Sequence, residues 1–171
     1  MFAKFLEGNS LQECYDACGE VATRWYDILE SKGEYVEDSE LIDYIGESRV
    51  IGKTQEEYGS QRSAQITCAK RLADVLGNEV AVEKGLNVKF IISKLPLNAS
   101  VTDRAIPTII FDTEEAVMKK YLRKWTGDGG MQDFDLRTII DWNYYKDRLA
   151  GTIMKIVTIP AALQNCCNPV P

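Results

Sequence analysis

A long amphipathic helix near the N-terminus constrains the fold of this chain more than any other feature. Ser10 and Glu13 match the capping-box pattern, with Ser10 as the N-cap and Glu13 three residues later. Gly33 indicates that the helix ends at about Lys32. Between these signals, apolar residues recur at helical spacing: Leu11, Tyr15, Cys18, Ala22, Trp25, Tyr26 and Leu29. A chain with such a segment is expected to be largely helical.

Shorter helices are predicted along the rest of the chain. Each combines a polar opening residue with apolar residues at helical spacing. Pro160 is expected to end the last of them, because proline lacks the N–H that a helix interior requires. The expected helices are Asp38 or Ser39 to Ile45, Ser60 or Ser63 to Leu76, a further turn over 78–84, 114–125, and about Trp142 to Thr158 after an opening Asp135 or Asp141.

Residues 88–93, VKFIIS, are the strongest strand candidate, because they are rich in β-branched and aromatic side chains. Residues 108–111 are a possible partner strand, and residues 49–57 are expected to be an extended or irregular connector. The fold class is therefore mostly α with a small β element, an α+β arrangement. A chain of 171 residues is expected to form one domain over 1–171, with an extended tail over 164–171.

The absence of histidine excludes several kinds of catalytic and metal site. Ser-His-Asp and Cys-His catalysis need an imidazole base, and many zinc sites need imidazole ligands. Five cysteines do not indicate a disulfide framework, and we interpret Cys14 and Cys18 as buried or incidental thiols. Acid pairs such as Asp133 and Asp135 could hold two metal ions in a hydrolase. With 26 acids in 171 residues such pairs are inevitable, and we expect no metal or other cofactor in this chain.

No membrane association is indicated. The chain has no apolar run near the 18 residues that a membrane-spanning helix needs. Its N-terminus, MFAKFLEGNS, lacks the apolar core of a signal peptide. The sequence therefore predicts an intracellular protein, or else a piece of a larger one, without a membrane partner.

Residues 58–71, YGSQRSAQITCAKR, form an acid-free patch in an otherwise acidic chain. The net charge is −6; residues 1–47 carry 3 bases and 12 acids (net −9), whereas residues 48–104 carry 9 bases and 6 acids (net +3). Arg, Lys, Ser, Thr and Gln side chains and helix N-termini all donate to phosphate oxygens. The patch therefore predicts contact with a nucleic-acid backbone, with a solvated loop and helix start as the alternative.

Other clusters favour structural interpretations. Trp142, Tyr144 and Tyr145 could stack on bases, but core packing is the better interpretation at the start of a helix. A second basic cluster complements the dipole at the end of its predicted helix. It comprises Lys119, Lys120, Arg123 and Lys124.

Cations also flank the predicted strand 88–93. Lys89, Lys94 and Arg104 could form a second phosphate clamp beside the patch. Arg104 follows Asp103, however, and a local ion pair between these neighbours would occupy it.

Several ordered segments of the chain resemble one known family at consistent spacing. They are EEYGSQRSAQITCAKRLADVLG, VKFIISK, TDRAIP, KKYLRKW, DFDLRTIIDWNYYKDRL and KIVTIPAALQN. Through them the sequence resembles the catalytic subunits of DNA polymerase epsilon, the leading-strand replicative polymerases of eukaryotes within family B. The resemblance runs from about Phe2 to Pro171 and is densest over 56–76, 89–107 and 119–164.

The resemblance implies that the chain is the thumb, the largely helical subdomain that grips the primer–template duplex. For the parent protein it implies a nuclear DNA-directed DNA polymerase, a nucleotidyltransferase of replication and repair. Its expected partners are primer–template DNA, the palm and the accessory subunits of the holoenzyme. Magnesium and an iron–sulfur cluster are expected outside this segment. The family's catalytic aspartates do not occur here, so the fragment alone is expected to be inactive.

Within the thumb, the resemblance supplies the neighbourhood of DNA contact and donor chemistry selects the side chains. The predicted DNA-binding residues are Ser60, Gln61, Arg62, Ser63, Thr67, Lys70, Arg71, Lys53 and Lys94.

A protein-interaction module is the competing function. In that interpretation the acidic helix over residues 11–32 docks a partner, and the basic patch is incidental. DNA binding that weakens with salt would separate the two.

Overall fold

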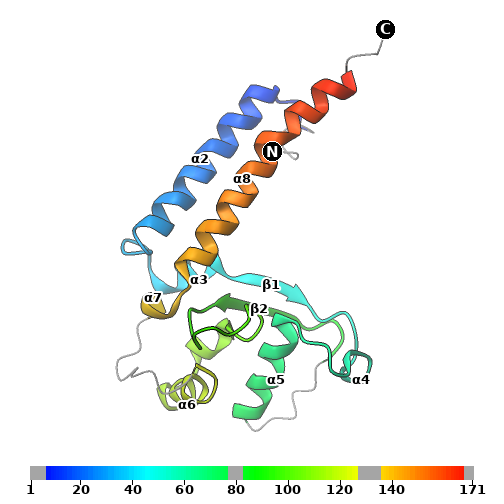
Figure 1. Cartoon of the computed structure of the whole chain (residues 1–171). Coiled ribbons are helices and arrows are strands. Elements are labelled where there is room, and N and C mark those ends of the chain that lie inside the picture. The colour runs from blue at the N-terminus through cyan, green and yellow to red at the C-terminus, as the bar shows by residue number, and fades with distance from the viewer. Residues whose placement is uncertain (1–6, 77–82, 127–135, 168–171) are drawn as a thin grey trace. The chain divides into compact units, whose positions relative to one another are not determined.

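The computed structural model describes residues 7–76, 83–126 and 136–167 (Figure 1). Its internal contacts divide the chain into two units, each described here by itself. One combines the residues up to Val36 with those from Trp142 onward, and the other spans Glu37–Asp141. Since two units can belong to one domain, the single domain over 1–171 stays a prediction.

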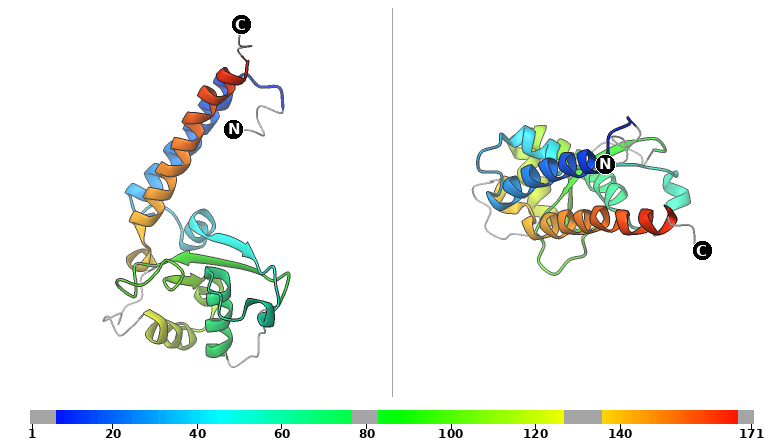
Figure 2. Two further views of the ribbon diagram at one scale, coloured as in Figure 1. Left: turned by 45° about the vertical axis from the view of Figure 1, so that its right-hand side comes forward. Right: turned by 90° about the horizontal axis from the view of Figure 1, so that it is seen from above.

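The first unit is a pair of helices. Helices α2 (Leu11–Glu30) and α8 (Trp142–Cys167) lie side by side and run in opposite directions (Figures 1 and 2). The capping box is confirmed, because the Ser10 N–H donates to Glu13 Oε2 at 2.7 Å and the Glu13 N–H donates to Ser10 Oγ at 3.2 Å. Cys14 and Leu29 are buried, and Lys146 forms an ion pair with Glu30 at 2.7 Å.

Helix α8 continues beyond the end that its sequence predicts. Proline costs a helix one hydrogen bond and introduces a steric clash, yet α8 runs through Pro160 to Cys167. The prediction that the helix ends near Thr158 is therefore wrong. The predicted extended tail is likewise wrong for residues 164–167, and residues 168–171 lie outside the described part.

The second unit is built around a three-stranded antiparallel sheet. Strand β2 (Asn87–Ile92) lies between β1 (Glu47–Val50) and β3 (Ala105–Pro107). Phe90 pairs with Glu47 on one side and with Pro107 on the other. Val88, Phe90, Ile91 and Ile92 are buried, as expected of a central strand that is covered by helices.

Helices pack against this sheet and against one another. Helix α5 (Ala64–Leu76) packs against β2 and β3, and α6 (Glu115–Thr126) packs against α5. The turn of 3₁₀ helix η1 (Thr108–Asp112) joins β3 to α6. The remaining helices of this unit are short: α3 (Asp38–Ile45), α4 (Gln55–Tyr58) and α7 (Leu136–Ile139).

The predicted fold class, mostly helical with a small β element, is confirmed. The predicted partner strand is wrong, because residues 108–111 lie in η1 and β2 pairs instead with β1 and β3. Helix α3 is preceded by Glu37 as N-cap, not by Asp38 or Ser39. The further turn predicted over 78–84 and the opening residue Asp135 fall wholly or partly outside the described residues.

Candidate nucleic-acid interface

The loop before α5 is folded by its own polar groups. The Tyr58 hydroxyl accepts a hydrogen bond from the Gly52 N–H at 2.9 Å, which closes the chain around α4. Gly59 has a φ of +49°, a conformation that glycine adopts at no steric cost. The Gln61 N–H then donates to the Tyr58 carbonyl at 2.8 Å. These contacts fix the path by which residues 60–63 enter α5.

The predicted donors from Ser60 to Lys70 lie on this loop and on the helix that follows. Ser60, Gln61 and Arg62 are exposed, and so is Lys70. The Thr67 N–H donates to the Ser63 carbonyl at 2.9 Å, which places Ser63 at the N-cap position directly before α5. Ser63, Thr67 and Lys70 follow one another at i, i+4 and i+7, so they share a helix face. The segment therefore presents a continuous set of donors.

Ser63 does not cap α5 with its side chain, contrary to the expectation from sequence. Its Oγ is buried and has no hydrogen-bond partner within the described structure. The hydroxyl thus forms no bond to the backbone N–H groups of the first turn, and its buried Oγ is not accessible to a ligand in this structure.

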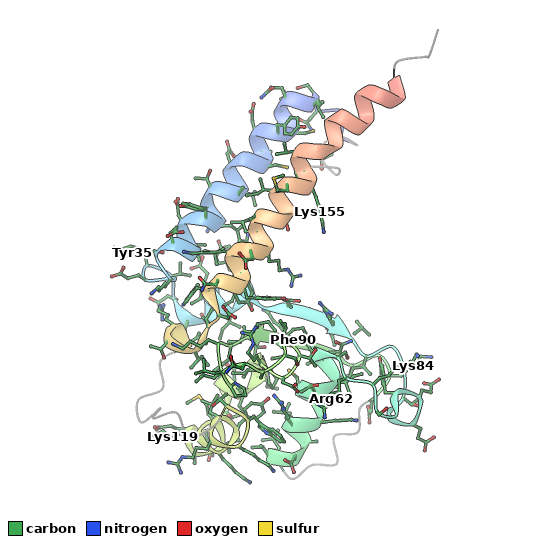
Figure 3. The ribbon with its side chains drawn as sticks, in the orientation of Figure 1. Tyr35, Arg62, Lys84, Phe90, Lys119 and Lys155 are labelled. Atoms are coloured by element: carbon green, nitrogen blue, oxygen red, sulfur yellow. The ribbon has the colours of Figure 1, made fainter. Side chains whose placement is uncertain are left out.

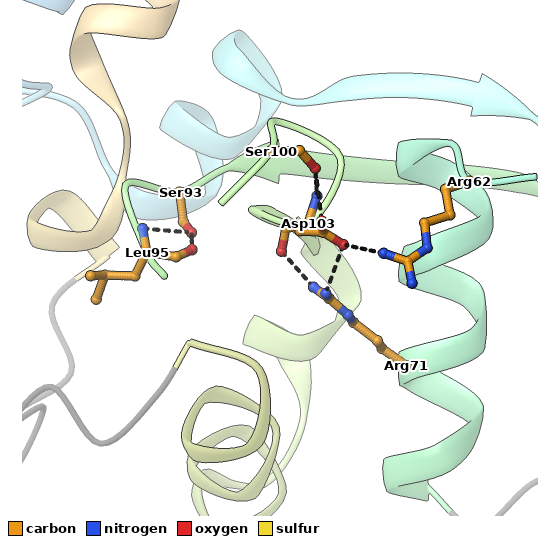
Figure 4. Close-up of polar contacts among 6 residues, drawn as sticks. All are labelled: Arg62, Arg71, Ser93, Leu95, Ser100 and Asp103. Carbon is orange, nitrogen blue, oxygen red and sulfur yellow. Dashed lines mark hydrogen bonds and ion pairs between the residues drawn. The ribbon is translucent and has the colours of Figure 1, made fainter. Parts of the chain in front are cut away.

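Arg62 and Arg71 have different environments although both approach Asp103 (Figure 4). The Arg62 side chain is 77% exposed, and its Nη1 lies 3.8 Å from Asp103 Oδ1. The Arg71 side chain is 13% exposed, and its Nη2 lies 3.5 Å from the same oxygen. Arg71 Nη1 also donates to the Asp103 carbonyl at 2.7 Å. Arg62 thus faces solvent, whereas Arg71 is an interior group.

Arg71 connects α5 to α6. Its guanidinium carbon lies 4.7 Å from the centre of the Trp125 ring, a distance typical of a cation–π contact. Burial raises the pKa of the neighbouring Cys68 thiol to about 12, against a smaller opposing effect of Arg71. Burial also raises the pKa of the Tyr121 hydroxyl. The Arg71 environment therefore has the character of a core.

The remaining cations of the predicted interface are dispersed. Lys53 is exposed in the loop before α4. Lys94 is exposed after β2, where its N–H donates to the Ile139 carbonyl at 2.8 Å. Figure 4 shows Ser93 and Leu95, the sequence neighbours of Lys94, at a distance from Arg62.

The second phosphate clamp is not assembled. Arg104 donates to the Ser93 carbonyl at 2.9 Å and forms an ion pair with the Asp141 carboxylate rather than with Asp103. Lys89 forms an ion pair with Asp43 of α3. Two of the three proposed cations thus have partners that stabilise the fold.

Sequence reasoning missed Lys84. Hydrogen bonds from the backbone and side chain of Thr54 lower the pKa of Glu57, and the charges of Lys84 and Lys53 lower it further. Figure 3 shows Lys84 beside α4. From the sequence, Lys84 is only the last residue of a predicted helical turn over 78–84. No local pattern indicates that it acts on the same carboxylate as Lys53.

Comparison with known proteins decides the family. A family model for the thumb domain of the DNA polymerase epsilon catalytic subunit matches residues 1–164. The chain belongs to this thumb-domain family.

Relatives of this family match the whole chain. The chain is 53% identical over 171 residues to the DNA polymerase epsilon catalytic subunit of Eremothecium gossypii and 50% identical to that of Saccharomyces cerevisiae. It is 47% identical to the Arabidopsis thaliana protein of the same name. Each alignment covers 100% of this chain and 8% of the relative. The resemblance to DNA polymerase epsilon seen in the sequence is thus confirmed.

The described residues of this thumb-domain family member do not fit a metal centre. They include no group of three or more His, Cys, Asp or Glu side chains that could hold a metal ion. Cys14, Cys18 and Cys68 are free thiols and are not assembled as ligands of an iron–sulfur cluster. Nor is any helix within the described ranges long and apolar enough to span a membrane.

The other clusters have structural roles. Lys119 forms an ion pair with Glu115 at 2.5 Å, and Lys124 forms one with Asp74 of α5. Core packing is confirmed for Trp142 and Tyr145, which are buried, whereas Tyr144 is only half-buried. None of these observations adds to the surface at the start of α5.

Proposed function

We propose that this chain is a DNA grip that holds primer–template duplex through its phosphate backbone. The observation that carries the proposal is the start of α5, where exposed Ser60, Gln61 and Arg62 lead directly into a helix that presents Thr67 and Lys70 on its next two turns. The chain's family is the thumb domain of a catalytic subunit named for DNA polymerase epsilon, which supports duplex DNA as the ligand.

The chemistry of this surface suits phosphate rather than bases. Arg62 and Lys70 supply charge, and the hydroxyl and amide groups between them supply neutral donors. The first N–H groups of α5 add the positive end of the helix dipole. Such contacts carry no sequence information, so the grip would hold any duplex and would support processive synthesis.

Within this proposal the predicted residues divide into three groups. Ser60, Gln61, Arg62, Thr67 and Lys70 contact the phosphates directly, and Ser63, Lys53 and Lys94 contribute less. The Ser63 Oγ is buried and would contact a phosphate only if the loop moved. Arg71 is a positioning residue, because its guanidinium is committed to Asp103 and Trp125.

The properties of the whole protein extend the proposal. The chain spans about 8% of the length of the relatives it matches. We propose that it serves a nuclear DNA-directed DNA polymerase of replication and repair, in which palm and accessory subunits are its protein partners. Catalytic aspartates, magnesium and the iron–sulfur cluster would belong to other segments, so this chain alone would not polymerise nucleotides.

Fluorescence anisotropy of a labelled primer–template duplex, from 25 to 200 mM salt, tests the grip. Replacing Arg62 and Lys70 together by alanine should weaken binding and reduce the slope of log K against log salt by about 2, one unit for each phosphate contact. The matched control replaces Arg123 and Lys119 of α6 by alanine. It removes the same charge, and its slope should stay close to that of the unmodified chain.

An equal loss of slope in both double variants would attribute binding to overall charge and would reject the α5 surface. Absence of salt-sensitive binding would favour the alternative, a protein-docking role for acidic α2. Val21 and Tyr26 of α2 are 59% and 54% exposed. They are five residues apart, however, about 140° around the helix, and do not form one apolar stripe.

A further inference from the structure

The Asp103 carboxylate stands between two arginines of the DNA-binding segment (Figure 4). Ser100 fixes it from one side, since Ser100 Oγ donates to Asp103 Oδ2 at 2.8 Å and accepts from the Asp103 N–H at 3.2 Å. The other oxygen, Oδ1, faces Arg71 at 3.5 Å and Arg62 at 3.8 Å. The position of this oxygen is therefore set by the loop and not by Arg62.

The two ion pairs differ in how easily they exchange. Arg71 keeps the Asp103 carbonyl at 2.7 Å and the Trp125 ring in addition to the carboxylate, and it is 13% exposed. Arg62 is 77% exposed, and its distance of 3.8 Å from Oδ1 is too long for a hydrogen bond. Exposed pairs of this kind contribute little to stability. Arg62 can therefore leave Asp103 while Arg71 stays in place.

We propose that Asp103 competes with DNA phosphate for Arg62 and so restrains the affinity of the grip. The inference rests on the proposed function, because it requires Arg62 to meet a phosphate. A carboxylate at this distance attracts the guanidinium, which must leave it in order to meet a phosphate. Asp103 has a second role, because its carbonyl and carboxylate also bind Arg71, which packs against Trp125 of α6.

The test measures duplex binding for Asp103→Asn in two backgrounds, with and without Arg62→Ala. Asparagine keeps the shape of the side chain and an oxygen that can face Arg71. We expect Asp103→Asn to tighten binding roughly two- to fivefold, the range of an exposed ion pair. In the Arg62→Ala background the same substitution should change affinity much less.

Asp74→Asn is the matched control. Asp74 is also half-exposed, belongs to α5 and pairs with Lys124. The substitution Asp74→Asn removes the same charge as Asp103→Asn, but at a position that does not face Arg62. It should therefore leave the affinity for duplex nearly unchanged. Asp103→Glu, which retains the charge, should bind like the unmodified chain.

Equal effects of Asp103→Asn and Asp74→Asn would overturn the inference, as would an effect of Asp103→Asn that persists without Arg62. The proposed function has its own test. It would be rejected if replacing Arg62 and Lys70 by alanine left duplex binding and its salt slope unchanged. NMR of the arginine side chains tests the inference in the unmodified chain, and it therefore works even if the Asp103 variants fail to fold. Added duplex should shift the Arg62 signal and leave that of Arg71 in place; equal shifts would contradict the competition.

Discussion

Arg71 shows why the type of a side chain does not determine its role. The sequence places it in an acid-free run of donors, where a surface cation is the natural interpretation. In the structure Arg71 is largely buried. Its guanidinium stacks on Trp125 and donates to the carbonyl of Asp103. The partner residues are distant in sequence, so no local pattern could reveal them.

Replacement of Arg71 by alanine should destabilise the second unit by about 2 kcal/mol, because a partly buried charge-assisted hydrogen bond and a packed side chain are lost together. Urea denaturation measures the change. Arg123→Ala, on the exposed end of α6, should stay within about 0.5 kcal/mol of the unmodified chain. Comparable stability of the two variants would show that Arg71 does not hold α5 to α6.

Cys68 should make stability depend on alkaline pH. Its thiol has a pKa of about 12 in the folded chain, against 9.0 when unperturbed, because burial disfavours the thiolate. Above pH 9 the unfolded chain therefore loses this proton while the folded chain keeps it. The contribution is complete below pH 9 and is lost progressively as pH rises toward 12.

Between pH 8 and pH 10 the unmodified chain should lose about 1.4 kcal/mol more unfolding free energy than Cys68→Ala, because one pH unit past the unfolded pKa corresponds to that amount. Denaturation at the two pH values gives the difference. Cys18→Ala, at a half-buried position, should behave like the unmodified chain. Parallel losses in all three proteins would place the alkaline transition elsewhere.

At the scale of elements, Gly46 determines how α3 passes into β1. A Cβ atom at this position would lie 2.5 Å from the Ile42 carbonyl oxygen and 2.7 Å from Lys89 Cε. The lysine can move, but the carbonyl belongs to the last turn of α3 and cannot. The glycine is therefore required by the close approach of helix and strand.

Gly46→Ala should cost about 1–3 kcal/mol of stability, the range for a substitution that overfills a packed site. Gly52 provides the control, since a Cβ atom there would meet only the Tyr58 hydroxyl at 3.8 Å. Gly52→Ala should be nearly neutral. Thermal unfolding of the pair measures the contrast, and equal melting temperatures would contradict the packing described for Gly46.

The elements differ in how well the sequence predicted them. Helices α2 and α6 were found because each has one buried stripe at helical spacing. Strand β1 was missed, because ESRV is almost wholly exposed and lacks an apolar alternation. Its position is set by pairing with β2, a tertiary effect that local propensity does not contain.

The candidate site was predicted in the same uneven way. The run from Ser60 to Lys70 is contiguous, so its donors are visible in the sequence and the family resemblance marks their neighbourhood. DNA contact by these residues stays a prediction. Arg104 was expected to pair with its neighbour Asp103, but the fold pairs it with Asp141. The donor composition of a continuous segment can be read from the sequence, whereas ion-pair partners brought together by the fold cannot.

At the scale of the molecule, a chain of net charge −6 would bind DNA through a local surface rather than through its overall field. Binding should be weak, roughly 10⁻⁴ to 10⁻⁶ M, and independent of base sequence. Two duplexes of equal length and scrambled sequence should give dissociation constants within about twofold of each other. A larger preference would require contacts with base edges.

The stacking of Arg71 on Trp125 also makes the fluorescence of Trp125 sensitive to the packing around it. A guanidinium 4.7 Å from an indole places a fixed charge against the excited-state dipole of that ring. Trp25 and Trp142 belong to the other unit, so substituting them by phenylalanine would leave a single emitter. Its wavelength would then report the packing of α5 on α6 in real time, without a label and without touching the surface that DNA would occupy.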